Sequence, residues 1–227
     1  MKIIELEEVD STNEYCKREN FVEDVIVIAK RQTAGRGTKG RSFVSYNGGL
    51  YISVMRHYKE FPAEKAFQIM INSCVAVCKT LESFSIKPQI RWANDVLVDG
   101  KKICGTLIEN TFGGNKILRS IVGMGINVNN KIPNDLKGIA TSITQHVSTK
   151  VTVEEVKNLL LHNLQMDFLI ADYKKFISYF GKNVLLKTED SERQVTALDI
   201  SDNGMLIVSE ADGTINKISS AEVSLRL

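Results

Sequence analysis

The residues best suited to chemistry in this sequence begin with a glycine-rich loop at residues 34–43, AGRGTKGRSF. Three of its glycines have the G-x-G-x-x-G spacing that binds a dinucleotide when it follows a strand and opens a helix. A strand does precede the loop, because residues 24–30, DVIVIAK, are apolar and rich in β-branched side chains. However, residues 50–55, LYISVM, read as another strand. The loop therefore joins two strands, which argues against a dinucleotide-binding fold.

The same loop carries three cations, Arg36, Lys39 and Arg41, and this composition suits the binding of an anion. The whole chain is nearly neutral, since 29 basic and 27 acidic residues among 227 leave a net charge of +2. No overall electrostatic field draws such a protein to DNA or to a membrane surface. We therefore expect a local anion site, and neither DNA nor a membrane as a partner.

Three further polar segments could contribute to a site: STN at 11–13, RWANDVLVDGKKICG at 91–105 and GMGINVN at 123–129. Asn94 and Asp95 could hold Mg²⁺ or a polar substrate, and Lys102 could stabilise negative charge that develops on a phosphate or carboxylate. Taken singly, each feature also has a structural explanation. The loop arginines could be solvated, Asn94 and Asp95 could form a turn, and Trp92 could be a core aromatic.

The strands expected to position these segments form one sheet. Apolar and β-branched runs predict strands at residues 2–9, 24–30 and 50–56. An antiparallel group should follow, made of QIRW, KKICGTLIEN and KILRSIVGMGINVN, with turns at Asp99-Gly100 and Gly113-Gly114.

Helices are expected in three places. An S-x-x-E capping box from Ser11 to Glu14 predicts a short helix to about residue 19. Apolar residues at helical spacing predict a long amphipathic helix over 63–83, with Cys74 and Cys78 on its buried face. A second capping box, at Thr152, predicts a long helical stretch that ends near Gly181.

The pattern changes after residue 181 to five short strands separated by glycine turns, which is typical of a small β-barrel. So short a segment folds only marginally alone, so we expect it to pack against the rest of the chain. The expected fold class is α+β: a mixed, largely antiparallel sheet with packed helices over residues 1–180, then a small barrel over residues 181–227.

The compartment is expected to be the cytoplasm. The N-terminal residues, MKIIELEEVD, are acidic where a signal peptide would be basic and then apolar, and no run of 18 apolar residues occurs. The cysteines have neither C-x-x-C spacing nor a partnering histidine cluster, which predicts reduced thiols and no zinc site at Cys16, Cys74, Cys78 and Cys104.

Taken together and in this order, the four segments resemble the biotin–protein ligase family, which attaches biotin to the carrier domain of acetyl-CoA carboxylase and related carboxylases. The resemblance covers nearly the whole chain. It rests on Ser11-Thr12-Asn13, Gln32 with the G-R-G loop, the W-x-N-D segment with Lys102 and Gly105, and Gly123-x-Gly125-Ile126-Asn127. The final EVSLRL also resembles the end of the family's small SH3-like barrel, and the resemblance implies a class II synthetase-like ligase domain before it.

The resemblance implies that ATP and biotin form biotinyl-5′-AMP, which then transfers biotin to a lysine of a biotin carboxyl carrier protein. Mg²⁺ would accompany the ATP phosphates, with no certain protein ligand, and the glycine loop would close over the intermediate. The implied catalytic residues are Lys102, Asp95 and Arg36. The implied biotin contacts are Ser11, Thr12, Asn13, Gln32, Gly35, Arg36, Gly37, Thr38, Lys102 and Gly105. The implied ATP and adenylate contacts are Arg36, Arg41, Phe43, Asn94 and Asn127.

Four positions depart from the family pattern. Arg91 and Ala93 replace the lysine and proline of K-W-P-N-D, and Phe43 stands where tryptophan is usual. Thr38 replaces the second arginine of G-R-G-R, which removes a guanidinium beside the adenylate. We expect Thr38 to weaken retention of the intermediate, with Lys39 as a possible substitute charge.

The resemblance leaves several alternatives open. Family members that repress an operon carry a winged-helix domain before the ligase, whereas STN begins here at residue 11, so we expect no sequence-specific DNA binding. The protein could be a monomer or a homodimer. The rival functions are a lipoate–protein ligase of related fold and a non-catalytic nucleotide-binding regulatory module.

Overall fold

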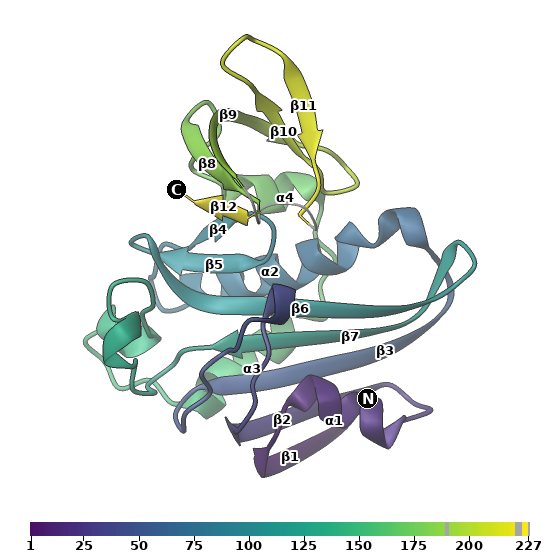
Figure 1. Cartoon of the computed structure of the whole chain (residues 1–227). Coiled ribbons are helices and arrows are strands. Elements are labelled where there is room, and N and C mark those ends of the chain that lie inside the picture. The colour runs from purple at the N-terminus through teal and green to yellow at the C-terminus, as the bar shows by residue number, and fades with distance from the viewer. Residues whose placement is uncertain (189–190, 221–223, 227) are drawn as a thin grey trace.

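The computed structural model describes residues 1–188, 191–220 and 224–226. Its main feature is a seven-stranded sheet in the order β1-β2-β3-β7-β6-β5-β4 (Figure 1). Only β1 and β2 pair in parallel, and the other neighbours are antiparallel. The strands are β1 (Lys2–Val9), β2 (Val25–Gln32), β3 (Leu50–Pro62), β4 (Gln89–Arg91), β5 (Asp95–Val98), β6 (Lys101–Gly113) and β7 (Lys116–Ile126). The expected mixed, largely antiparallel sheet is confirmed.

One face of this sheet is covered by helices (Figure 1). Helix α2 (Phe67–Glu82) packs against β5, β6 and β7, while α3 (Val153–Asn163) and α4 (Ile170–Lys175) pack against α2. Cys74 and Cys78 lie on the buried side of α2, as its spacing predicts. Residues that alternate along β7, such as Val122 and Ile126, point into this main core because successive side chains of a strand face opposite ways.

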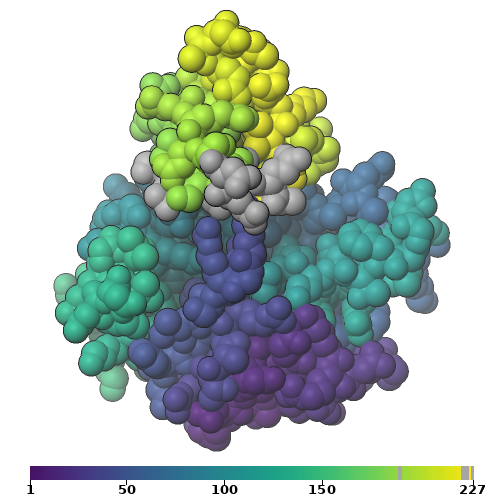
Figure 2. All heavy atoms as spheres, in the orientation of Figure 1, coloured from purple at the N-terminus to yellow at the C-terminus, as the bar shows by residue number. Residues whose placement is uncertain are grey.

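The opposite face is covered only in part. Helix α1 (Thr12–Glu19) packs on β2, β3 and β7 over a small apolar cluster of Cys16, Val25, Val27, Met55 and Ile121. Beyond this cluster, the glycine loop runs out from β2, makes a short 3-10 turn at Thr38–Gly40 and returns to β3. Figure 2 shows the loop, in dark blue, on the front surface between the N-terminal part and the C-terminal sheet.

The C-terminal part forms a second, antiparallel sheet in the order β11-β10-β9-β8-β12. Its strands are β8 (Asn183–Lys187), β9 (Glu192–Ile200), β10 (Leu206–Ser209), β11 (Ile215–Ile218) and β12 (Ser224–Arg226). The expected five strands are therefore present. They contact the first part of the chain through a 2.9 Å hydrogen bond from Trp92 Nε1 to the Gly204 carbonyl and a 2.7 Å ion pair between Lys174 and Asp199. The expectation that this unit packs against the larger one is confirmed.

The expected single helical stretch before Gly181 is wrong, because the chain breaks it into α3 and α4. Between them, Phe168 turns into the core, where its N–H donates to Asn72 Oδ1 and its carbonyl accepts from Gln68 Nε2. These bonds replace the helical ones. Gly181 ends no helix: it has φ of +76° and lies in the turn before β8.

The two expected capping boxes have different outcomes. At α3, Thr152 Oγ1 accepts from the Glu155 N–H at 3.2 Å and Glu155 Oε2 accepts from the Thr152 N–H at 2.8 Å, which confirms the box. At α1, Ser11 occupies the N-cap position but makes no side-chain cap hydrogen bond. Glu14 pairs instead with Lys17 and Arg36, and the Ser11 N–H that it would accept from in a capping box donates to Asp10 Oδ1 at 2.8 Å.

Two other features bear on function. Among the helices that the structure describes, none is long and apolar enough to cross a bilayer. The four cysteines are free and buried. Burial raises the pKa of the Cys16 and Cys74 thiols to about 12, so these groups are not thiolates at neutral pH.

The junction between the two sheets can be tested with a matched pair of glycines. Gly204 and Gly213 have φ of +85° and +86°, but a methyl group would collide with the Phe67 ring at Gly204 and meet nothing at Gly213. We expect Gly213→Ala to lower the free energy of unfolding by about 1–2 kcal/mol through backbone strain. Gly204→Ala should cost about 1–3 kcal/mol more, from overpacking. Urea denaturation measures both, and equal losses would contradict tight packing at the junction.

Candidate active site

The floor of the candidate site is a trough in the sheet face opposite α2. Gly105 on β6 lies directly across from Gly125 on β7, and Gly123 precedes Gly125 by two residues on the same face. Because none of these positions has a side chain, a ligand can approach the backbone of two central strands. Thr106, Leu107 and Met124 complete this part of the lining.

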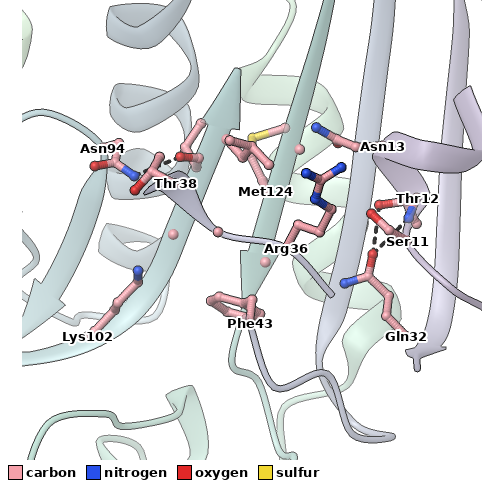
Figure 3. A pocket seen from close by; sticks show the side chains of 16 residues that line it. Ser11, Thr12, Asn13, Gln32, Arg36, Thr38, Phe43, Asn94, Lys102 and Met124 are labelled. Carbon is pink, nitrogen blue, oxygen red and sulfur yellow. Dashed lines mark hydrogen bonds between the residues drawn. The ribbon is translucent and has the colours of Figure 1, made fainter. Parts of the chain in front are cut away.

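One end of the trough is lined by neutral polar groups from α1 and β2 (Figure 3). The Thr12 N–H and Oγ1 both donate to Gln32 Oε1, at 2.8 and 3.1 Å, and Gln32 Nε2 donates to Ser45 Oγ at 2.8 Å. Ser11, Thr12 and Asn13 are almost fully buried. These bonds fix the orientation of the side-chain amide and hydroxyl, so this end presents preset donors and acceptors.

Two residues in this network were not predicted from the sequence. Ser53 Oγ on β3 lies 2.7 Å from Thr12 Oγ1 and 2.6 Å from Asn13 Oδ1. Glu109 on β6 accepts from Asn13 Nδ2 at 2.9 Å and from Lys17 Nζ at 2.6 Å. The only signal that could have located them is strand register, since Ser53 pairs with Gly123 of the GMGIN segment.

The other end of the trough is charged. Lys102 Nζ lies 2.6 Å from Asp95 Oδ1, and Arg91 Nη2 lies 2.6 Å from Asp95 Oδ2. The Asp95 side chain is only 15 % exposed. Burial acts to raise the pKa of Asp95, but the Lys102 ammonium and the Arg91 guanidinium outweigh burial and hold the pKa below its ordinary value. Asp95 is therefore ionised at neutral pH and fixes Lys102 at the edge of the cavity.

The glycine loop covers the trough from above. Arg36, Gly37, Thr38 and Phe43 all line the cavity, and Figure 3 shows Arg36 reaching toward Asn13 and Thr38 lying beside Asn94. The Phe43 ring packs over Gly125, and Lys102 Nζ lies 5.7 Å from its centroid. About 40 Å³ of free volume remains beneath the loop.

A neighbouring cavity of about 260 Å³ shares Phe43 and Lys102 with the first one and contains Asn127. Asn127 is buried, its Nδ2 donates to the Thr141 carbonyl at 3.0 Å, and its Oδ1 accepts from Asn130 Nδ2 at 3.0 Å. The remaining lining is largely apolar and comes from the segment after β7, including Ile132, Pro133, Leu136, Ile139 and Ala140. The two cavities therefore meet at one aromatic ring and one ammonium group.

The structure brings most of the predicted site residues together in the first cavity: Ser11, Thr12, Asn13, Gln32, Arg36, Gly37, Thr38, Phe43, Asn94, Lys102 and Gly105. Asn127 lines the neighbouring cavity, while Asp95 and Arg41 line a third hollow of about 320 Å³ with Thr38 and Asn94. Gly35 lies outside these linings. A side chain there would collide with the Phe43 carbonyl and Ser45 Oγ.

The arrangement suits a ligand with a neutral polar head and an acidic end. The hydroxyl and amide groups at one end can satisfy the head, and Lys102 and Arg36 can neutralise an anion at the other. Among the described residues, no three histidine, cysteine, aspartate or glutamate side chains form a cluster that could hold a metal ion. Such a cavity, next to a second one that shares its cation, is fitted to join two anionic substrates.

Comparison with known proteins agrees with this geometry. The model of the biotin/lipoate A/B protein ligase family matches residues 6–127, and that of the biotin protein ligase C-terminal domain matches residues 179–226. The bifunctional ligase/repressor BirA of Bacillus subtilis is 32% identical over 221 residues, which are 91% of this chain and 67% of that protein. The biotin–[acetyl-CoA-carboxylase] ligase of Mycobacterium tuberculosis is 24% identical, over 90% of this chain and 80% of its own length.

Solved structures show the same fold over the whole length. The biotin protein ligase from Aquifex aeolicus in complex with biotin and ATP superposes with a TM-score of 0.82 and is 31% identical, covering 99% of this chain and 98% of its own. The ligase from Leishmania major in complex with biotinyl-5-AMP has a TM-score of 0.66 at 26% identity, over 96% of this chain and 99% of its own. The chain therefore belongs to the biotin/lipoate A/B protein ligase family and is one of its biotin protein ligases.

Proposed function

We propose that this enzyme joins biotin to ATP to form biotinyl-5′-AMP and pyrophosphate, and then transfers biotin to a lysine of the biotin carboxyl carrier protein of acetyl-CoA carboxylase. One observation carries the proposal: the cavity with neutral polar groups at one end and Lys102 at the other opens beside a second cavity that shares Lys102. The reaction belongs in the cytoplasm, where ATP is available. The scheme applies equally to a monomer and to a homodimer.

In this scheme the neutral end of the trough holds the ureido ring of biotin. Ser11, Thr12, Asn13 and Gln32 supply donors and acceptors whose positions are fixed by their own hydrogen bonds. The three glycines of the floor allow the ring system to lie against β6 and β7. The biotin carboxylate then lies toward Lys102, because that is where the cavity becomes cationic.

Lys102 has the central chemical role. A carboxylate that attacks a phosphate meets electrostatic repulsion, and an ammonium placed between the two groups lowers that cost in the transition state. Asp95 acts as a positioning residue, since its ion pair holds Lys102 and it is itself held by Arg91. Asn94 is oriented by a 2.8 Å hydrogen bond from its Nδ2 to the Thr106 carbonyl, which leaves its Oδ1 free to face the phosphate side.

ATP is proposed to occupy the neighbouring cavity. Its apolar walls and the Phe43 ring suit a flat purine base, and Asn127 marks the adenine side. Arg36 and Arg41 supply positive charge for the phosphates from the loop. In this structure both Asp95 oxygens are paired with cations, so the residues present fit a Mg²⁺ ion that arrives with the phosphates rather than one held by the protein alone.

In this proposal the two parts of the chain have different roles. Residues 1–180 supply the biotin and ATP cavities, and residues 181–227 form the SH3-like unit. The third hollow lies between them, with Thr38 and Asn94 on one side and Leu225 on the other. It gives the acceptor lysine a route to the carboxyl end of the trough.

The first test of the proposal distinguishes biotin from the rival substrate. We expect pyrophosphate release from ATP to depend on added biotin and to remain at background with lipoate, because lipoate lacks the ureido group that the neutral end would bind. The measurement compares three reactions: with biotin, with lipoate and with neither acid. Release with lipoate alone would identify a lipoate ligase, and release with neither acid would indicate a different nucleotide-dependent activity.

The second prediction concerns Lys102. We expect Lys102→Ala to lower the rate of biotin-dependent pyrophosphate release about a hundredfold or more, the scale for removing one preorganised charge-stabilising group. Some stability should also be lost, because Asp95 would keep only Arg91 as a partner. Lys101→Ala is the matched control, since this neighbouring lysine lies outside the cavity lining. A folded Lys102→Ala enzyme with normal release would rule out the proposed role.

The third prediction concerns Thr38, which lines both the trough and the hollow beside it. An arginine here would add a charge-assisted contact to the adenylate, worth about 1.5–3 kcal/mol before any compensation from nearby cations. We therefore expect Thr38→Arg to slow the dissociation of preformed biotinyl-adenylate at least several-fold, measured without acceptor. An unchanged rate would show that other loop groups already hold the intermediate.

A further inference from the structure

A further hollow, which we call the rear cavity, lies on the helix-covered face of the sheet, between β3, β7 and α2 (Figure 1). Its volume is about 210 Å³, larger than the roughly 150 Å³ of an engineered apolar cavity that binds benzene. Strand β7 separates it from the trough, since Gly123 and Gly125 face the trough while Val122 and Met124 face the helices. A ligand in the rear cavity therefore leaves the biotin and ATP cavities free.

The body of the rear cavity is apolar. Its lining includes Val54, Phe61, Ile69, Val122, Met124 and Leu164. These side chains come from the sheet on one side and from the helical layer on the other. An aliphatic or aromatic group of a ligand would be stabilised between them, because each methylene that it buries leaves water.

Two opposite charges line the rear cavity beside these apolar groups. Arg56 comes from β3 and is half-buried, whereas Asp167 comes from the segment between α3 and α4 and is exposed. Within the described part of the chain neither forms an ion pair. Arg56 Nη2 donates to the Leu164 carbonyl at 3.4 Å, and Asp167 Oδ1 accepts from Asn72 Nδ2 at 3.4 Å. Both bonds are longer than the usual range of about 2.7–3.2 Å, so both charges can still bind a ligand.

The two charges belong to neighbouring parts of the cavity wall. Arg56 reaches the carbonyl of Leu164, and Asp167 follows Leu164 by three residues in the same segment. This segment is fixed, because the backbone of the next residue, Phe168, is hydrogen-bonded to two side-chain amides of α2. Because Arg56 and Asp167 are held near each other without pairing, they suit a ligand that carries both a carboxylate and a cation.

We propose that the rear cavity binds an apolar α-amino acid, with its carboxylate on Arg56, its ammonium on Asp167 and its side chain between β7 and α2. Such a molecule carries both charges and the apolar group on one carbon atom, so it matches both charges and the walls together. A simple carboxylic acid would place its anion near Asp167, and a simple amine would place its cation near Arg56. The inference does not rest on the biotin chemistry, because the trough lies on the opposite face.

The first part of the test uses the wild-type full chain. Titration of isotope-labelled protein, followed by NMR, measures Kd for L-leucine, L-methionine and L-phenylalanine. We expect at least one of them to bind with a Kd of about 1 mM or tighter. The side-chain amide signals of Gln68 and Asn72, which line the rear cavity, should shift on binding. Weaker binding of all three, or shifts confined to the trough, would overturn the proposal.

The second part removes one ligand group at a time. The amino acid that binds most tightly is compared with its analogue without the ammonium, its analogue without the carboxylate, and L-alanine; for leucine, the first two are isocaproate and isoamylamine. Each should bind at least about tenfold more weakly, because each leaves one part of the site unfilled. Equal binding of either analogue would indicate a site for a simple acid or amine, and equal binding of L-alanine would exclude the apolar walls. Any of these results overturns the assignment.

The third part changes the protein. Arg56→Gln and Asp167→Asn should each weaken binding at least about tenfold. Lys59→Gln is the matched control, since it removes an exposed cation from the same strand outside the lining, and it should leave Kd unchanged. Unchanged binding in either charge variant would contradict the proposal. If urea denaturation shows that Arg56→Gln is unfolded, the wild-type comparison with the analogue without the carboxylate still decides the role of Arg56.

A final measurement separates this site from the proposed function. Saturating biotin should leave amino-acid binding in place, because the two ligands lie on opposite faces of the sheet. Competition between them would place the amino acid in the trough and overturn the inference. If the protein binds no biotin at all, the proposed function fails, while the ligand-free titrations with amino acids still decide whether the rear cavity is a binding site.

Discussion

The register between β6 and β7 is the constraint on which the rest of the site depends. It places Gly105 opposite Gly125 and Leu107 opposite Gly123, so that one stretch of the sheet face has almost no side chains. Because side chains alternate along a strand, a shift of β7 by one residue would put a larger side chain such as Val122 where a glycine now lies. Every other group of the site is positioned relative to this bare stretch of backbone.

The charged groups around the trough illustrate how the structure keeps cations in a partly enclosed place. Lys102 is paired with a buried carboxylate that is itself shared with Arg91, and Arg36 is paired with a carboxylate that is shared with Lys17. In the first group one acid serves two cations, so the pairing leaves positive charge over; the second group is balanced, because Lys17 also pairs with Glu109. That excess is what an anionic intermediate can use without any rearrangement of the surrounding side chains.

Much of the fold was predictable because the strands are regular and their apolar runs are unambiguous. The hairpins at Asp99-Gly100 and after Gly113, the amphipathic α2 and the change of pattern before β8 all carry strong local signals. The break between α3 and α4 does not, because it depends on Phe168 finding a place in a core built by distant residues. Local sequence patterns therefore predict helices and strands well, but they do not predict where a helix is interrupted.

The site residues likewise fall into those that a local sequence pattern predicts and those that depend on distant parts of the chain. Residues within the ordered motifs could be identified from sequence, whereas Ser53 and Glu109 could not, because each belongs to the site only through cross-strand neighbours. Glu14 was visible but misread, since its spacing from Ser11 suits a helix cap and its tertiary partners lie elsewhere in the chain. A charged residue near a motif is assigned reliably only once its competing partners are known.

The chain has a single tryptophan, and its place in the structure gives it a practical use. Trp92 is buried beneath the second sheet, and its indole N–H is hydrogen-bonded to the Gly204 carbonyl. Its intrinsic fluorescence therefore comes from the seam between the two sheets rather than from the ligand cavity. Separation of the two units would expose the indole to water and shift its emission to longer wavelength, which makes the protein its own optical probe of whether they remain joined.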